Sequence, residues 1–303
     1  MPHPLLTRHN NERVWLVDAS IYVFRAWFVR GYIPYDRDHH PVNAVRGFLH
    51  FLYAFLHEQR PQHLAFAFDT SLQTSARKAI YPAYKANREP APPELKYQFQ
   101  LCRDFLDALG IVQRASVHDE ADDLIGSWAA QQRHQQGADT QIIIISGDKD
   151  LAQLISNHDL WWDYGRRKPL HDGGIKSEFG VWPQQLADQL AMAGDKADNI
   201  PGIPGVGMAT AAKLLKRFGN LDNLLQNARQ IGQMQIHGAK RLQQLVTEHQ
   251  TTVRLARQLT GINCKVADLP QDLRRGPKQA DQLRELCERL QLSEQQYQQW
   301  LAI

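Results

Sequence analysis

Three short apolar runs, each followed closely by an acidic residue, are the feature that most limits how this chain can fold. The runs and their acids are residues 14–17 with Asp18, residues 64–68 with Asp69, and residues 142–145 with Asp148. Continuous apolar runs of this length are typical of strands that are buried on both faces, as in a parallel sheet. Helical patterns at residues 44–56 and 99–109 lie between them. This alternation predicts a doubly wound α/β domain, with a mostly parallel central sheet and flanking helices.

Acidic residues gather where predicted strands end or predicted helices begin. In an open α/β sheet the carboxyl ends of the strands form the edge at which ligands bind, so we expect Asp18, Asp69 and Asp148 to lie there together. Residues 120–123 open a predicted helix and can direct carboxylates toward the same edge, although the helix dipole alone also favours acids in a first turn. The nine acids in these motifs are Asp18, Asp69, Glu120, Asp122, Asp123, Asp148, Asp150, Asp195 and Asp198.

Carboxylates at this density would repel one another unless hard divalent cations neutralised them. Mg²⁺ and similar ions prefer carboxylate and water ligands. Without the nine candidate ligands, 23 acids remain against 35 Lys and Arg, so the rest of the protein carries a charge of +12. An acidic centre in a basic protein suits a polyanionic substrate whose phosphate is delivered to metal ions. The sequence therefore predicts a metal-dependent enzyme.

Composition also bounds the domain count and the cellular compartment. A chain of 303 residues is long enough for two domains, which we place at residues 13–178 and 179–303. The three cysteines have no CxxC pair, which argues against a disulfide framework or a zinc knuckle. No stretch approaches the length of an apolar membrane span. We expect a soluble, cytoplasmic protein.

Strand signals stop after about residue 178, and the remainder of the chain has helical patterns. These patterns are residues 182–193, 209–218, 239–259 and 280–290. A glycine and proline hairpin at residues 194–207 joins two of them, and it can expose backbone N–H groups beside a helix N-terminus, which is a phosphate-binding arrangement. Such a unit would hold duplex backbone without reading bases. The alternative is an ordinary loop between two helices.

The order of these motifs resembles the 5′-nuclease domain at the N-terminus of bacterial DNA polymerase I and in phage and eukaryotic flap endonucleases. The resemblance covers roughly residues 13–265, and its most specific parts are residues 81–88, 120–123, 147–154 and 194–207. It implies a PIN-like or resolvase-like nuclease core, followed by an all-helical domain with a helix-hairpin-helix-like element. Because no polymerase or proofreading region follows, we expect a stand-alone form.

The resemblance also implies roles for the acids. Asp18, Asp69, Glu120 and Asp122 would bind a catalytic metal pair. The remaining five, Asp123, Asp148, Asp150, Asp195 and Asp198, would support another metal position. Mg²⁺, or Mn²⁺ in its place, would hydrolyse a phosphodiester by a two-metal mechanism.

Basic and aromatic residues near the acids match a helical arch of the family at about residues 77–96. Lys85 and Arg88 would lie over the scissile phosphate, and Tyr84 would stack on an unpaired base. Arg77 and Tyr81 are weaker members of the same group. The alternative is that Lys85 and Arg88 are solvated surface residues after a proline turn.

The hairpin would bind the unbroken duplex strand and organise a K⁺ ion with backbone carbonyls near Ile203 and Val206. Lys240 and Arg241 resemble a second phosphate contact. The expected DNA-binding residues are Arg77, Tyr81, Gly202, Gly205, Val206, Gly207, Lys213, Lys240 and Arg241.

The sequence thus predicts a monomeric, structure-specific 5′-3′ exonuclease and flap endonuclease. Its substrates would be branched or 5′-ended duplex DNA, with RNA primers in RNA–DNA hybrids as a further class, in replication and repair. Two alternatives remain. A PIN-like ribonuclease shares the carboxylate crevice but usually has fewer acids and no glycine hairpin. A branched-DNA binding protein that has lost catalysis would bind a flap without cutting it.

Overall fold

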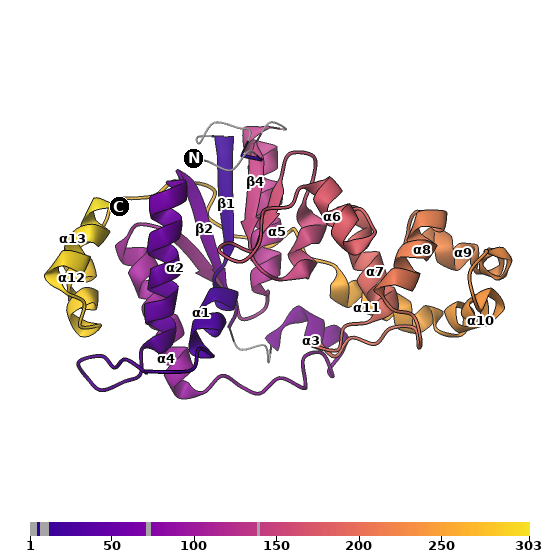
Figure 1. Cartoon of the computed structure of the whole chain (residues 1–303), viewed down its shortest axis with the longest axis horizontal. Helices are drawn as coiled ribbons and strands as arrows, with labels where there is room; N and C mark the ends of the chain where they lie inside the picture. The colour runs from indigo at the N-terminus through magenta and orange to yellow at the C-terminus, as the bar shows by residue number, and fades with distance from the viewer. Residues whose placement is uncertain (1–4, 7–11, 71–73, 138–139) are drawn as a thin grey trace.

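A five-stranded parallel sheet forms the centre of the molecule (Figure 1). The computed structural model describes residues 5–6, 12–70, 74–137 and 140–303. The strands are β1 (Arg13–Asp18), β2 (His63–Phe68), β3 (Val112–Ala115), β4 (Gln141–Ile145) and β5 (Leu160–Trp162). They lie in the order β3-β2-β1-β4-β5, and every adjacent pair is parallel. The predicted fold class is confirmed.

The three predicted strands are the three central ones, and the two edge strands were missed. β3 has the sequence Val-Gln-Arg-Ala, and β5 has only three residues. An edge strand has a neighbour on one side only and need not be apolar on both faces, so neither segment shows a continuous apolar run. The apolar pattern therefore detects the centre of this sheet and not its edges.

Alternate residues of the central strands enter two separate cores, one on each face of the sheet. Leu16, Ala65 and Ile144 belong to the first core, whereas Trp15 and Phe66, which are direct chain neighbours of the first two, belong to the second. Successive side chains of a strand point to opposite faces. Both faces of the sheet are therefore covered, which is why the strands are apolar throughout.

The two cores contain different sets of helices. The first core contains residues of α5, η3, α6 and α7, and the second contains residues of α1, α2 and α4. The helices of the α/β part are α1 (Ala19–Trp27), α2 (Asn43–Gln59), α3 (Ala76–Ile80), α4 (Pro93–Ala108), α5 (Ala121–Gln136), the 3-10 helix η3 (Lys149–Leu154) and α6 (Asp172–Phe179).

A helical region continues the first core away from the sheet, toward the right of Figure 1. Its elements are η4 (Pro183–Gln185), α7 (Leu186–Ala193), α8 (Met208–Phe218), α9 (Leu221–Gln226), η5 (Ala228–Gln233), α10 (Ala239–Glu248) and α11 (Gln250–Thr260). The expected single helix over 239–259 is two helices that meet at His249. No glycine or proline marks this break. It results from tertiary packing, since α10 packs on η5 and α11 packs on α7.

The last two helices do not pack in this helical region. α12 (Ala280–Arg289) and α13 (Glu294–Ala302) belong to the second core with α2 and α4, at the opposite end of the molecule from α8 and α10 (Figure 1). The connecting segment crosses back along the α/β part, where the amide of Leu64 donates to the carbonyl of Leu273 at 2.7 Å. Trp300 packs edge-on against Phe105, with 4.9 Å between ring centroids.

In the described parts of the chain, no helix is both long enough and apolar enough to span a bilayer.

We predict that Trp300→Ala lowers the free energy of unfolding by about 3–5 kcal/mol, because the indole is 5% exposed and its removal leaves a cavity against Phe105. Trp182→Ala is the matched control, since that indole is 41% exposed and its ring meets the Lys176 ammonium. It should cost about 1 kcal/mol or less. Urea denaturation measures both. Equal losses would contradict the packing of the last helix.

Candidate active site

The carboxyl edge of the central strands carries three of the predicted acids. Asp18 is the last residue of β1, Asp69 directly follows β2, and Asp148 follows β4 by three residues. The Ser146 hydroxyl connects two of them, because its Oγ donates to Asp18 Oδ2 at 2.8 Å and accepts from the Asp148 amide at 2.9 Å. The strand order reverses at β1, so this edge is a topological switch point, where open α/β sheets bind ligands.

The first turn of α5 brings further acids to this edge. Glu120 is the N-cap of α5, and the amide of Ala121 donates to Asp69 Oδ1 at 2.9 Å. Asp122 is half-buried, and Asp148 and Asp18 act on its carboxyl electrostatically. Burial first, and then these negative neighbours, raise the pKa of Asp122 well above its ordinary value. The start of α5 therefore lies beside the carboxyl ends of the strands.

The hairpin and η3 contribute the remaining acids. The Asp150 amide donates to Asp148 Oδ1 at 2.9 Å, which makes Asp148 the N-cap of η3. Lys149 Nζ donates to Asp195 Oδ2 at 2.7 Å. Lys85 Nζ lies 3.6 Å from Asp198 Oδ2. Acids from separate chain segments are thus linked at one edge, with basic side chains between them.

Burial and the crowding of negative charge strongly raise the pKa of two more of these carboxyl groups. Burial, followed by the charge of Asp69, raises the pKa of Asp18 to about 7. Burial, followed by the charge of Asp148, raises the pKa of Asp150 to about 7. The metal-free protein therefore holds these groups partly protonated near neutral pH.

Lys85 is the cation at the centre of this arrangement. Its Nζ donates to Glu120 Oε2 at 2.7 Å, and its side chain is 9% exposed. Burial alone would lower its pKa, but the charges of Glu120 and Asp198 outweigh burial and raise it well above the ordinary value. The Lys85 backbone is left-handed, with φ of 51°, and its amide donates to the Asp198 carbonyl at 2.9 Å. Arg88 pairs with the carboxylate of Asp198 and is about half exposed.

Tyr84 does not occupy the position expected for stacking on a base. The residue is 2% exposed and belongs to the first core. Its hydroxyl lies 3.0 Å from Glu120 Oε2 and 3.3 Å from Asp198 Oδ2, within hydrogen-bonding distance of both. The hydroxyl can donate its single proton to either of these two acids, and the buried ring has no face free for a nucleobase.

The expected helical arch over residues 77–96 is only partly helical. It consists of the five-residue α3, a turn that contains Tyr84 and Lys85, and the beginning of α4. The segment runs along the carboxyl edge of the sheet (Figure 1). Tyr81 is half-buried against the first core. Prolines around residue 90 keep the connection to α4 extended.

Asp123 and Arg77 pair with each other, which does not fit the metal and DNA roles predicted for them. The guanidinium donates to both Asp123 carboxylate oxygens, at 2.7 and 2.8 Å. The same oxygens also accept from the amides of Glu120 and Asn263. Asp123 is 3% exposed and Arg77 is 8% exposed. Four donors leave Asp123 no lone pair for a cation, so its role is structural.

Two carboxylate oxygens at the edge are suited to a cation. Glu120 Oε1 and Asp150 Oδ1 are buried and have no hydrogen-bond partner among the described residues, although Lys149 lies 3.4 Å from Asp150 Oδ1. A buried anionic oxygen without a donor is costly, and a divalent cation would satisfy it. The donor set fits a divalent metal.

A separate group of metal-ligand type lies outside this edge. The side-chain ligand atoms of Asp36, Asp38 and His40 are within 4.8 Å of one another. Asp36 is fully buried, and its oxygens already accept from two loop amides and from the Tyr97 hydroxyl. This carboxylate therefore organises its loop.

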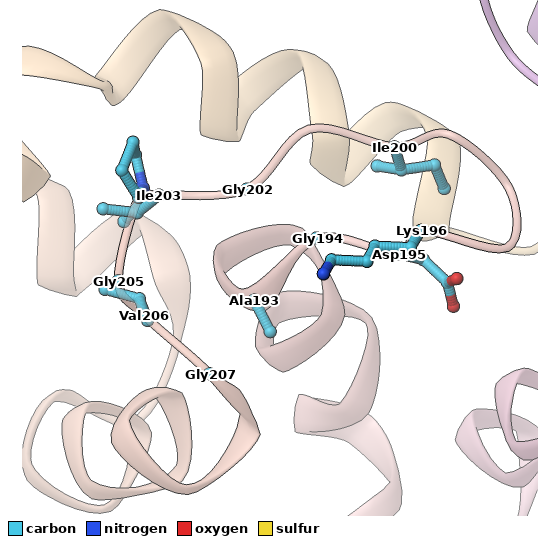
Figure 2. A pocket seen from close by; sticks show the side chains of 11 residues that line it. Ala193, Gly194, Asp195, Lys196, Ile200, Gly202, Ile203, Gly205, Val206 and Gly207 are labelled. Carbon is cyan, nitrogen blue, oxygen red and sulfur yellow. The ribbon is translucent and has the colours of Figure 1, made fainter.

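The glycine hairpin forms a hollow of about 360 Å³ beside α8 (Figure 2). Gly194 and Gly202 pass so closely that a Cβ on Gly202 would lie 2.4 Å from the Gly194 nitrogen. Gly205 has a φ of 77°, which favours glycine. Ile203 and Val206 are buried and anchor the turn to the first core. Gly207 is the N-cap of α8.

The basic residues predicted for DNA contact lie on helices beyond the hairpin. Lys213 is exposed on α8, and Lys240 and Arg241 are exposed on α10.

Sequence reasoning missed several residues that organise the acids. Ser146, Lys149 and Gln153 all contact the acids or their backbone. Ser146 and Lys149 immediately flank the Gly147-Asp148 step, so their position in the motif was an available signal. Gln153 had none.

Comparison with known proteins identifies the family of the chain. Residues 13–180 match the family described as 5′-3′ exonuclease, N-terminal resolvase-like domain, and residues 181–283 match 5′-3′ exonuclease, C-terminal SAM fold. The DNA polymerase I of Rhizobium leguminosarum is 37% identical over 269 residues, which are 86% of this chain and 25% of that protein. The 5′-3′ exonuclease of Aquifex aeolicus is 36% identical over 216 residues, which are 71% of this chain and 73% of that protein.

A solved structure also shares the fold. The bacteriophage T5 flap endonuclease, in a pseudo-enzyme-product complex with DNA and metal ions, superposes with a TM-score of 0.64 at 16% identity, over 96% of this chain and 98% of that one. The structure combines an α/β sheet that has carboxylates at one edge with a helical hairpin region. This chain belongs to the 5′-3′ exonuclease family. It spans about a quarter of the length of the polymerase relative.

We predict that the metal-free protein becomes less stable as pH rises from about 4 to about 7. The folded state binds the Asp18 proton more tightly than the unfolded chain does, with a pKa of about 7 against 3.8. This stabilisation is complete below pH ~4 and is lost as pH rises through the folded pKa, by about 1.4 kcal/mol per pH unit. Denaturation in a chelator at several pH values measures it.

Asp18→Asn should reduce this pH dependence, whereas Asp222→Asn, whose carboxylate is 74% exposed, should leave it unchanged. An unfolding free energy of the unaltered protein that rises over the same pH range would contradict the prediction.

Proposed function

We propose that the protein is a structure-specific 5′-3′ exonuclease and flap endonuclease that depends on Mg²⁺. The observation that carries the proposal is the meeting of buried carboxylates at one sheet edge, where Glu120 Oε1 and Asp150 Oδ1 lack hydrogen-bond partners among the described residues. The proposed ligands are the acids of that edge: Asp18, Asp69, Glu120, Asp122, Asp148, Asp150, Asp195 and Asp198. Mn²⁺ can replace Mg²⁺ at such oxygen sites.

Bound divalent ions would activate a water and stabilise the charge on the phosphate and the leaving 3′-oxygen. The chain itself orients the ligands of these ions. Ser146 holds Asp18 and the backbone of Asp148, and the Tyr84 hydroxyl, with one proton, can orient either Glu120 or Asp198. Lys85 and Arg88 hold positive charge at the same edge, where it would offset charge on a bound phosphate.

DNA would be held by the helical region. The exposed Lys213, Lys240 and Arg241 can contact the duplex backbone, and backbone contacts position DNA without reading its sequence. Backbone carbonyls near Ile203 and Val206 are our proposed K⁺ site. The substrate would be branched or 5′-ended duplex DNA, including the RNA segment of an RNA–DNA hybrid.

We predict that Asp148→Asn lowers kcat on a labelled 5′-flap substrate with Mg²⁺ by roughly 10²-fold or more, because even residues that only orient metal ligands cost up to about that factor. Asp222→Asn is the control, since it removes the same charge from an exposed position. Full activity in Asp148→Asn would reject the metal assignment. Cleavage restricted to an all-RNA strand would favour a ribonuclease, and flap binding without cleavage by the unaltered protein would favour a binding protein.

We also predict that Lys240→Gln and Arg241→Gln each weaken duplex binding to all sequences alike, and that each lowers the dependence of log K on log salt concentration by about 1. Arg284→Gln is the control, because this half-exposed guanidinium lies on α12 at the opposite end of the molecule. Fluorescence anisotropy at several salt concentrations measures the slopes. An unchanged slope in both variants would remove α10 from the DNA interface.

A further inference from the structure

One five-residue segment at the end of α11 contacts three separate elements of the candidate site. Residues 259–263 lie where the helical region returns to the α/β part, and their backbone groups bond to side chains of α3, η3 and α5. The carbonyls of Leu259 and Gly261 accept from Arg77, the carbonyl of Thr260 accepts from Gln153, the amide of Ile262 donates to Gln153, and the amide of Asn263 donates to Asp123.

Gln153 connects this segment to the acids of η3. Its Nε2 donates to the Asp150 carbonyl at 2.9 Å and to the Thr260 carbonyl at 3.1 Å, and its Oε1 accepts from the Ile262 amide at 3.3 Å. One side chain therefore fixes the backbone that carries Asp150 relative to the end of α11. An apolar side chain of the same length could fill the space but could make none of these bonds.

Arg77 connects the same segment to the acids of α5. Its Nε donates to the Leu259 carbonyl at 3.0 Å, and one terminal nitrogen donates to the Gly261 carbonyl at 2.9 Å. Both terminal nitrogens of the guanidinium also donate to the Asp123 carboxylate. That carboxylate in turn accepts from the Glu120 amide at 3.1 Å. The N-terminal turn of α5, which carries Glu120 and Asp122, is therefore held in place by a buried ion pair.

The turn that carries Asp150 and the turn that carries Glu120 are thus both bound to residues 259–263. Buried ion pairs contribute little net stability compared with apolar residues of similar volume, but they fix geometry through directed bonds. Groups that orient metal ligands without touching the metal typically change metal affinity or activity by roughly 10–100-fold when they are removed.

We propose that Gln153 and Arg77 are positioning residues of the nuclease site, which hold the Asp150 and Glu120 turns at a fixed separation through residues 259–263. This inference rests on the proposed function, because it assigns these residues to the same carboxylate edge. Neither residue touches substrate or metal in this role.

The first test is Gln153→Met in the full-length protein, with Mn²⁺ alone as the probe. Calorimetric titration without DNA should show a Kd for Mn²⁺ raised about tenfold or more. Gln141→Met is the matched control. Gln141 is buried and Gln153 is half-buried. The Nε2 of Gln141 also donates to two backbone carbonyls, those of Leu5 and His158, at the amino end of β4 and away from the acids. Gln141→Met should change the Kd for Mn²⁺ by about twofold or less, which is smaller than the effect of removing a group that orients a metal ligand. Both variants should lower the melting temperature, because each loses hydrogen bonds.

The second test is the double variant Arg77→Met/Asp123→Leu, which replaces the ion pair with apolar side chains and leaves neither partner as an unpaired buried charge. We expect a lower melting temperature, because the backbone groups that these two side chains bind lose their partners. We also expect a raised Kd for Mn²⁺ and a lower kcat on a 5′-flap with an unchanged KM. The split between kcat and KM separates positioning from a DNA contact by Arg77, which would raise KM. If Gln153→Met fails to fold, this variant decides the question.

The outcomes separate the two proposals. Equal Mn²⁺ affinity in the unaltered protein, Gln153→Met and the double variant would overturn the positioning role and leave the nuclease proposal standing. An unaltered protein that binds no Mn²⁺ would overturn the metal site itself, and the positioning role with it.

Discussion

Mutual repulsion of carboxylates at the carboxyl edge of the sheet is the constraint on which the rest of the site depends. A parallel sheet necessarily brings its strand ends together, and here those ends carry acids. The protein separates the charges with hydroxyl donors and with cations such as Lys85 and Lys149, and it raises the pKa of Asp18 to about 7. Two buried oxygens are left that a divalent cation would complete.

Much of this arrangement was predictable from the sequence. The central strands are buried on both faces and so are continuously apolar, and a parallel order places the residue after each strand at one edge. The positions of Asp18, Asp69 and Asp148 at that edge result from these two facts. The hairpin was equally visible, because the close approach of Gly194 and Gly202 excludes any side chain at the second position.

Other features depend on contacts between distant segments, which periodicity does not encode. Asp122 and Asp123 are adjacent in the chain, yet one faces the acids and the other is saturated by Arg77 and by backbone amides such as that of Asn263. Tyr84 has the composition of a stacking residue, but its ring lies in the core. The docking of α13 depends on apolar positions of a glutamine-rich helix, which local sequence gives no reason to assign to one end of the molecule.

The return of the chain along the α/β part has a mechanical consequence. The helical region leaves the sheet layer after α6, and it is tied back at the end of α11 and again where Leu273 meets β2. A body joined to another through a single linker can swing in any direction. Here the helical region is fastened at separated points and shares one apolar core with the sheet. The hairpin that carries Asp195 and Asp198 is therefore braced on both sides, and its two acids keep their places beside Lys149 and Lys85.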